Sequence, residues 1–139
     1  MRIVLLSFFI IIVITGCENE SPNLDPTLTG RWEWIRTEGG FNAHIHETPT
    51  TTGNSYLLKF AKDNKILISM NDTTIFTGEY EIKKEESIYS GKIENYIKNS
   101  DQYYIQNLVI SGILKLDNDT LTISDNAHDG LSSNYKRIR

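Results

Sequence analysis

From about residue 28 onwards the chain consists of short stretches in which apolar and polar residues alternate. Such alternation is typical of half-buried β-strands, because successive side chains of a strand point to opposite faces of the sheet. No stretch of ten or more residues in this part has a persuasive helical period. We therefore predict an all-β domain with strands at 30–38, 55–61, 65–70, 73–83, 87–97, 103–111, 113–116, 120–124 and 133–139.

Residues that favour tight turns separate these strands. The segments 62–64, 71–72 and 117–119 consist mainly of Asn and Asp, which tolerate a positive φ at the corner of a hairpin. Turns this short join antiparallel strands that are neighbours in the sequence. Because a row of strands leaves two exposed edges unless it closes, we predict an antiparallel up-and-down β-barrel of about eight strands.

The alternation also assigns strand faces. In the first strand, Trp32, Trp34 and Arg36 are expected on one face and Thr37 on the other. One apolar stripe is expected to fill the barrel interior. It comprises Trp32, Trp34, Tyr56, Leu58, Phe60, Ile66, Ile68, Met70, Phe76, Tyr80, Ile82, Leu114, Leu116, Leu121 and Ile123.

The longest segment without a strand pattern is 39–54, GGFNAHIHETPTTTGN. A long loop between the first two strands is often found at the mouth of a barrel, where binding residues are frequent. We expect this loop to be irregular, and either functional or disordered.

The N-terminal region is expected to be an export signal. Arg2 precedes twelve almost entirely apolar residues, Ile3 to Ile14. A membrane-spanning helix needs about twenty apolar residues, so this run has the length of a signal peptide. The sequence Ile14-Thr15-Gly16-Cys17 resembles the lipobox of bacterial lipoproteins. That resemblance implies cleavage before Cys17 and a diacylglyceryl anchor, carrying acyl chains such as palmitate, on the Cys17 thiol.

This resemblance implies a protein anchored in a membrane of the bacterial cell envelope, with the outer membrane, on its periplasmic or surface face, as the expected location. The expected organisation is a signal peptide at 1–16, a lipidated cysteine and flexible tether at 17–27, and a barrel domain at 28–139. Since Cys17 is the only cysteine, its lipidation leaves no thiol for a disulfide or a metal site. The formal net charge of −4 gives no reason to expect a nucleic-acid partner.

Three segments resemble small bacterial lipocalin-like, or calycin-type, lipoproteins. The first, Leu28 to Trp34, contains a Gly-x-Trp start, the second spans 56–80, and the third is the closing pair of strands at 121–137. The resemblance implies a cup-shaped barrel in which Trp32 closes the floor beside Gly30 and Arg137 packs over Trp32. The tryptophan and the arginine would then be structural residues.

The resemblance and the aromatic stripe together predict a small apolar or amphipathic ligand inside the cup. The candidate ligand-binding residues are Trp34, Tyr56, Phe60, Phe76 and Tyr80. The alternative hypothesis is a structural or interaction protein with a barrel filled by side chains, whose outer face or 39–54 loop binds an envelope partner that the sequence does not identify.

Motifs for catalysis or cofactors are weak. His44 and His46 could share one face of an extended segment and bind a metal, with Glu47, His128 or Asp129 as further ligands. A structural zinc site uses four ligands and the local spacing positions two, so we expect two solvated histidines and no metal. The chain lacks a nucleophile elbow and a phosphate-binding loop, so we expect no enzymatic activity and no cofactor.

Overall fold

The structure is a computed structural model, and it describes residues 28–100 and 105–139. The signal expected at 1–16, the anchor and tether expected at 17–27, and the beginning of the strand expected at 103–111 lie outside the described residues.

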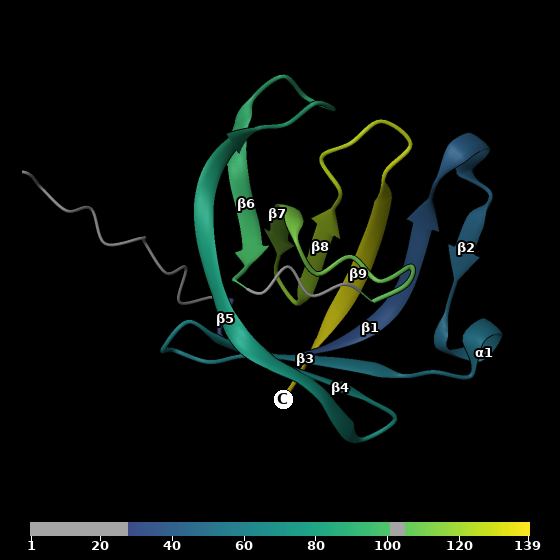
Figure 1. Cartoon of the computed structure of the whole chain (residues 1–139), viewed down its shortest axis with the longest axis vertical. Helices are drawn as coiled ribbons and strands as arrows, with labels where there is room; N and C mark the ends of the chain where they lie inside the picture. The colour runs from purple at the N-terminus through teal and green to yellow at the C-terminus, as the bar shows by residue number, and fades with distance from the viewer. Residues whose placement is uncertain (1–27, 101–104) are drawn as a thin grey trace, which may run out of the picture.

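The described residues form nine antiparallel strands, eight of which close into a barrel (Figure 1). The barrel strands are β1 (Gly30–Gly39), β3 (Tyr56–Phe60), β4 (Lys65–Met70), β5 (Thr73–Glu86), β6 (Ile93–Asn99), β7 (Gly112–Asp117), β8 (Thr120–Ser124) and β9 (Leu131–Ile138). Each pairs with the next, and β9 pairs with β1 to close the ring. The predicted closed antiparallel barrel is therefore confirmed.

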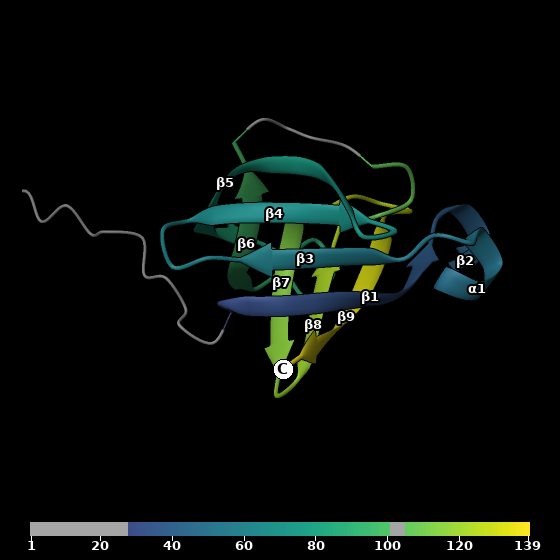
Figure 2. The same cartoon turned by 90° about the horizontal axis from the view of Figure 1, so that it is seen from below.

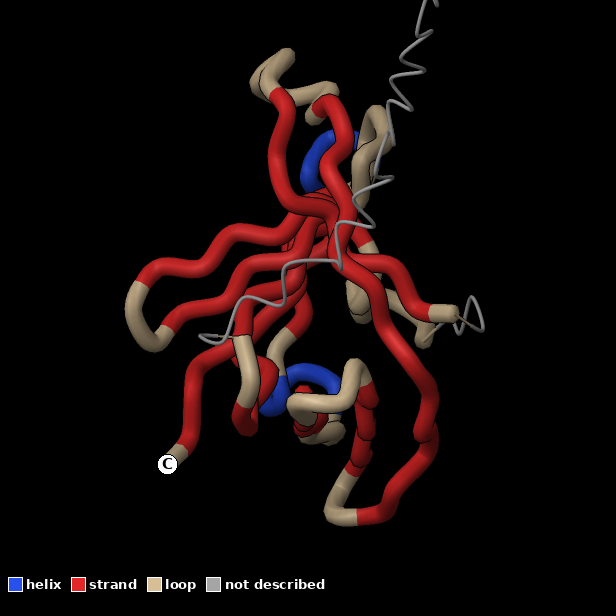
Figure 3. Tube along the Cα trace, turned by 90° about the vertical axis from the view of Figure 1, so that its left-hand side faces the viewer, coloured by secondary structure: helices blue, strands red, loops and turns tan. Residues whose placement is uncertain are grey.

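The ninth strand, β2 (Ile45–Glu47), lies beside the end of β1, beyond the part of β1 that β3 covers. Two short helical turns flank it, η1 (Phe41–Ala43) and α1 (Pro49–Thr52). They are the blue segments of Figure 3, in which the described chain is otherwise strand and loop.

The long strand β5 turns the sheet through a corner. Its residues 73–79 pair with β4, and its residues 80–86 pair with β6. In Figure 2, β1, β3 and β4 lie side by side and cross the strands β7, β8 and β9 behind them. The inward side chains of the two halves therefore meet in one core.

The predicted apolar stripe supplies most of this core. Its fully buried members are Trp32, Trp34, Leu58, Phe60, Ile66, Ile68, Tyr80, Leu114, Leu121 and Ile123. The predicted turns also form, since Asn64, Asn71, Asp72 and Asn118 all have a positive φ. Local pattern and tertiary packing agree at these positions.

A β-bulge corrects the face predicted for the end of β1. The register against β9 shifts between Trp34 and Arg36, so one extra residue reverses the alternation. Thr37 is completely buried instead of facing out, whereas Arg36 is exposed on the outer face.

The strand predicted at 87–97 is wrong in its first half. β5 continues to Glu86, and residues 87–92 form a turn in which Ser87 N–H donates to the Lys92 carbonyl over 2.9 Å. Gly91 takes φ 64° there, a conformation that suits glycine. The strand that follows, β6, begins at Ile93.

The strand predicted at 103–111 is also wrong for its described part. Residues 105–111, here called the strap, make one isolated bridge between Ile105 and Leu108 and no ladder. Figure 1 shows the strap reaching from β7 across β8 and β9 towards β1. Leu108, Val109 and Ile110 are at most 4% exposed, so this apolar run is buried as a plug of the barrel and not as a strand.

The segment 39–54 has more structure than predicted. Thr48 and Thr51 form a capping box: Thr51 N–H donates to Thr48 Oγ1 over 3.2 Å, and Thr48 N–H donates to Thr51 Oγ1 over 2.8 Å. Pro49 starts α1, and Gly53 ends it in the left-handed conformation. The loop is thus a short ordered unit beside the barrel.

Candidate functional site

The interior of the barrel is occupied by its own aromatic side chains. Among the candidate ligand residues, Trp34, Phe60 and Tyr80 are 2%, 1% and 3% exposed. Trp34 meets Tyr56 edge to face at a centroid distance of 5.5 Å, and Phe60 meets Tyr80 in the same way at 5.1 Å. Burial raises the pKa of Tyr80, and the nearby Asp63 charge adds to the effect. These residues therefore contact one another and hold the core together.

Phe76 and Tyr56 are the candidates with partly exposed side chains, and both pack against the edge of the core. Phe76 comes from β5 and Tyr56 from the start of β3. The structure therefore divides the predicted five-residue ligand site into three core residues and two residues at its border.

One end of the barrel is closed by Trp32 and Arg137. Arg137 Cζ lies 4.1 Å from the centroid of the buried Trp32 ring, and Arg137 Nη1 donates to the Thr29 carbonyl over 3.0 Å. Trp32 Nε1 donates to the Leu28 carbonyl over 2.8 Å. A Cβ on Gly30 would lie 2.8 Å from Arg137 Nη1, so the glycine leaves room for the guanidinium.

The strap closes the other end through a buried polar network. Trp34 Nε1 donates to Thr37 Oγ1 over 3.0 Å, and the Thr37 and Ser133 hydroxyls are 2.6 Å apart. Val109 N–H donates to Ser133 Oγ over 2.8 Å. The strap backbone, which has no ladder partner there, is thus satisfied by side chains of the barrel wall.

Tyr135 completes this closure. Its hydroxyl donates to the Val109 carbonyl, and its side chain is fully buried. Burial raises the pKa of Tyr135 far above its ordinary value, so the phenol stays neutral. Trp32 thus packs at one end of the barrel, and the strap covers the other end.

A groove of about 550 Å³ lies on the outside of the barrel. We call it the outer groove, and its lining comprises Glu38, Gly39, Ala43, Ile45, His46, Ser87, Tyr89, Ile113, Lys115, Ser124, Gly130, Leu131 and Ser132. Strand register brings the residues of the groove floor together. The floor consists of successive cross-strand partners on β7, β8, β9, β1 and β2, which are Ile113, Ser124, Ser132, Glu38 and His46.

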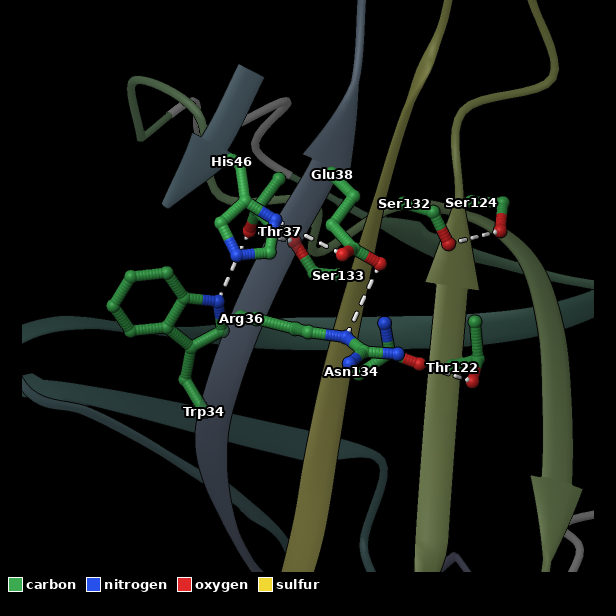
Figure 4. A network of polar contacts seen from close by, with 10 residues as sticks. All are labelled: Trp34, Arg36, Thr37, Glu38, His46, Thr122, Ser124, Ser132, Ser133 and Asn134. Carbon is green, nitrogen blue, oxygen red and sulfur yellow. Dashed lines mark hydrogen bonds and ion pairs between the residues drawn. The ribbon is translucent and has the colours of Figure 1, made fainter. Parts of the chain in front are cut away.

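The floor is polar along its centre (Figure 4). The Ser124 and Ser132 hydroxyls are 2.8 Å apart. Glu38 Oε2 is 3.1 Å from Arg36 Nε, and Glu38 Oε1 is 3.0 Å from His46 Nδ1. The carboxylate of Glu38 is therefore held between two nitrogen groups at one side of the groove.

The apolar part of the groove lies against the turn between β5 and β6. Ile113 points outward yet is 2% exposed, and Tyr89 lines the same groove from that turn. The Tyr89 hydroxyl lies 2.8 Å from the Ala127 carbonyl oxygen, and Ile88 N–H donates to Asn126 Oδ1 over 2.9 Å. These bonds fasten the turn to the β8–β9 loop and so form one wall of the groove.

The lining also carries a basic group, Lys115 of β7. Lys115 Nζ is 3.5 Å from Glu94 Oε2. A hydrogen bond from Ser90, together with the Lys115 charge, holds the pKa of Glu94 below its ordinary value. The groove thus combines an apolar patch with hydroxyl, carboxylate and ammonium groups, which is the general character of small-molecule sites.

A second, smaller cavity of about 280 Å³ lies between α1, β3 and the strap. We call it the polar pocket, and its lining comprises Trp34, Glu47, Thr52, Asn54, Tyr56, Gln106 and Asn107. Asn107 Nδ2 donates to Glu47 Oε1 over 2.6 Å, which ties the strap to β2.

The two histidines do not come together on a metal site. His44 Nδ1 is 2.6 Å from the Phe41 carbonyl oxygen, whereas His46 turns to Glu38. Within residues 28–100 and 105–139, no group of three or more His, Cys, Asp or Glu side chains could hold a metal ion.

Sequence reasoning missed both cavities. The outer groove depends on strand register and on the way the β5–β6 turn folds back, and neither has a local sequence signal. The polar pocket depends on the strap and on α1. The sequence does contain a signal for α1, because Thr48 and Pro49 favour the beginning of a helix and Gly53 favours its end.

Comparison with protein-family models, curated proteins and solved structures finds no match for this chain. The class that the structure defines is a closed antiparallel β-barrel of eight strands, an architecture compatible with the lipocalin-like fold. No helix in the described part of the chain has the length and apolar character needed to cross a membrane.

Proposed function

We propose that this protein is a lipid-anchored, non-enzymatic binding protein of the bacterial cell envelope, and that the outer groove holds a small amphipathic ligand. The observation that carries the ligand proposal is the groove itself, an open cavity of about 550 Å³ within the usual size range of ligand sites.

The lining supports an amphipathic ligand. Ile113, Leu131 and Tyr89 offer apolar surface, while Ser124 and Ser132 offer hydroxyl groups beside them. A ligand with an apolar body and a polar group can satisfy both parts, whereas a purely apolar ligand would bury the hydroxyls without new hydrogen bonds.

The groove is favoured over the cup interior because the interior aromatics contact one another. A ligand between Trp34, Phe60 and Tyr80 would have to separate packed rings and displace the strap. That rearrangement would expose apolar surface and cost about 25 cal/mol of folding free energy for each Å² exposed.

Two matched variants on β8 test the groove. Ser124→Phe puts a ring into the groove, and Thr122→Phe puts the same ring on the same outer face, beside Lys115 but at a position that is not part of the groove lining. Each variant loses one side-chain hydrogen bond, that of Ser124 with Ser132 or that of Thr122 with Asn134. The two should therefore differ in groove occupancy and not in stability.

The experiment is native mass spectrometry of protein purified from its own host in mild detergent. We expect a bound small molecule in the wild type and in Thr122→Phe, and its loss in Ser124→Phe. Retention of the molecule by Ser124→Phe would exclude the outer groove as its site.

The lipid anchor rests on the Ile14-Thr15-Gly16-Cys17 sequence. Diacyl attachment gives stable membrane binding where a single acyl chain does not. Cys17→Ser should abolish metabolic labelling with a fatty acid and release the protein from the membrane fraction. Persistent label in that variant would exclude Cys17 as the anchor.

A second candidate function is binding of an envelope protein. It is favoured by the exposed apolar side chains around the β5–β6 turn, where Ile88, Tyr89 and Ile93 are 43%, 57% and 65% exposed. Scattered exposed residues are common, but a group of three at one hairpin tip is a candidate contact surface. Crosslinking from position 93 in intact cells should recover one specific protein, and recovery of background alone would count against this function.

A further inference from the structure

Among the residues that the structure describes, the lining of the polar pocket has one acidic side chain and no basic one. Glu47 is the single charged residue of its lining, and no ion pair among the described residues involves it. One carboxylate oxygen, Oε1, accepts from Asn107 Nδ2 over 2.6 Å. The fixed charge of the pocket is therefore negative, and a cation inside it would be attracted.

Aromatic rings form part of the same lining. Trp34 and Tyr56 meet there edge to face with centroids 5.5 Å apart. The indole N–H of Trp34 donates to Thr37, so this hydrogen atom is not available to a ligand in the pocket. The faces of aromatic rings are negative and attract organic cations, most strongly where water is excluded.

The remaining lining residues supply oxygen acceptors. Gln106 carries a side-chain amide oxygen that can accept, the Thr52 hydroxyl is already bonded to Thr48 and Asn54, and neither residue brings a positive charge. The volume of about 280 Å³ is close to the lower end for small-molecule sites. Shape and chemistry together select a compact ligand with positive charge.

We propose that the polar pocket binds a small organic ammonium group, with Glu47 as counter-ion and the Trp34 and Tyr56 rings as its wall. The site is separate from the outer groove, because β2 contributes His46 to the groove and Glu47 to the pocket. A ligand in one cavity does not require a ligand in the other.

The first test compares two probes on the full-length protein in a non-ionic detergent, by titration calorimetry. The probes are choline and 3,3-dimethyl-1-butanol, which share a shape but differ in charge. We expect choline to bind at least about tenfold more tightly than the neutral alcohol, a ratio that corresponds to 1.4 kcal/mol. Equal affinity of the two probes, or no binding of choline, would overturn the proposal.

The second test removes the charge and keeps the shape. Glu47→Gln retains an oxygen that can accept from Asn107, and it should weaken choline binding about tenfold or more. Glu33→Gln, on the exposed face of β1, loses the same charge outside the pocket and should bind choline as the wild type does. Wild-type affinity for choline in Glu47→Gln would show that Glu47 is not the counter-ion and would overturn the proposal.

A third variant separates the ring from the charge. Tyr56→Leu leaves Glu47 in place and removes one aromatic wall, so choline affinity should fall several-fold while the preference over the neutral alcohol persists. Choline binding in the groove variant Ser124→Phe should equal that of the wild type. Its loss there would mean that the two cavities are one site.

Discussion

The stacking of Arg137 on Trp32 is expected to contribute measurably to the stability of the folded barrel. The side chain of Arg137 is 20% exposed, and the ring of Trp32 beneath it is fully buried. A cation over a desolvated indole contributes up to about 2 kcal/mol, and a charged donor on a backbone carbonyl contributes about 1.5–3 kcal/mol. Since a methionine can still cover the ring, we expect Arg137→Met to lower the free energy of unfolding by about 2–4 kcal/mol.

Arg139→Met is the matched control. Arg139 also reaches Asp119, at 3.6 Å, but its side chain is 88% exposed and no ring lies beneath it in the described contacts. An exposed ion pair of this kind contributes about 0–1 kcal/mol. The two variants remove the same charge from neighbouring parts of the chain, so their difference reports the contacts that Arg137 alone makes, among them the stacking on Trp32 and the bond to Thr29.

The assay is urea-induced unfolding followed by tryptophan fluorescence, because both tryptophans are buried. With a urea m-value of about 2 kcal/mol per M, the expected loss moves the midpoint of Arg137→Met down by about 1–2 M. Arg137→Lys, which keeps the charge but not the planar group, should fall between that variant and the wild type. Equal midpoints for Arg137→Met and Arg139→Met would refute a stabilising role for the stacked guanidinium.

Three further outcomes follow from the strap and the sheet. Ser133→Ala removes the hydroxyl that bonds with Val109 N–H and with the Thr37 hydroxyl. Urea unfolding should show that the free energy of unfolding falls by about 2–4 kcal/mol. A fall of less than about 0.5 kcal/mol would contradict the dependence of the strap on this network. The pKa of Tyr135 is near 10.0 in the unfolded chain and is raised in the folded protein. The contribution of its neutral phenol to the free energy of unfolding is therefore complete below pH 10, and it declines above pH 10 by about 1.4 kcal/mol per pH unit. Urea midpoints of Tyr135→Phe should therefore fall less steeply between pH 10 and 11 than those of the wild type, and parallel curves would exclude this linkage. Gly112 has a φ of 151°, and a Cβ added there would clash with the backbone oxygen of Ser124 on β8. Gly112→Ala should therefore lower the free energy of unfolding by about 3 kcal/mol or more in thermal unfolding. An unchanged Tm would show that the strand can shift to accept the methyl group.

Much of the barrel could be predicted because its signals are local. Alternation placed Leu58, Phe60, Ile66 and Ile68 inside, and each is at most 1% exposed. The turn residues were equally readable, since a positive φ at Asn118 follows from the preference of a single residue type.

The errors arose where distant contacts decide the backbone. Leu108, Val109 and Ile110 form an apolar run that also suits a buried strand, and only the hydrogen bonds to Ser133 and Tyr135 make it a strap. The bulge after Trp34 contains no glycine that would have indicated it in the sequence. It turns Thr37 inward, where its hydroxyl bonds with that of Ser133. Both cavities depend on these long-range choices.

By itself, the sequence determined the all-β class, the inward apolar stripe and the positions of the tight turns, because period-two alternation and positive-φ residues act over a few neighbouring positions. It also contains the Cys17 signal on which the proposed anchor rests. The tertiary structure alone decided that the interior is filled and that the cavities lie outside it. Strand register brings Glu38, Ser124 and Ser132 together on one outer face, and the strap brings Asn107 to Glu47. The pairings of Glu38 with Ser132 and of Asn107 with Glu47 join residues far apart in the chain, so no local pattern encodes them.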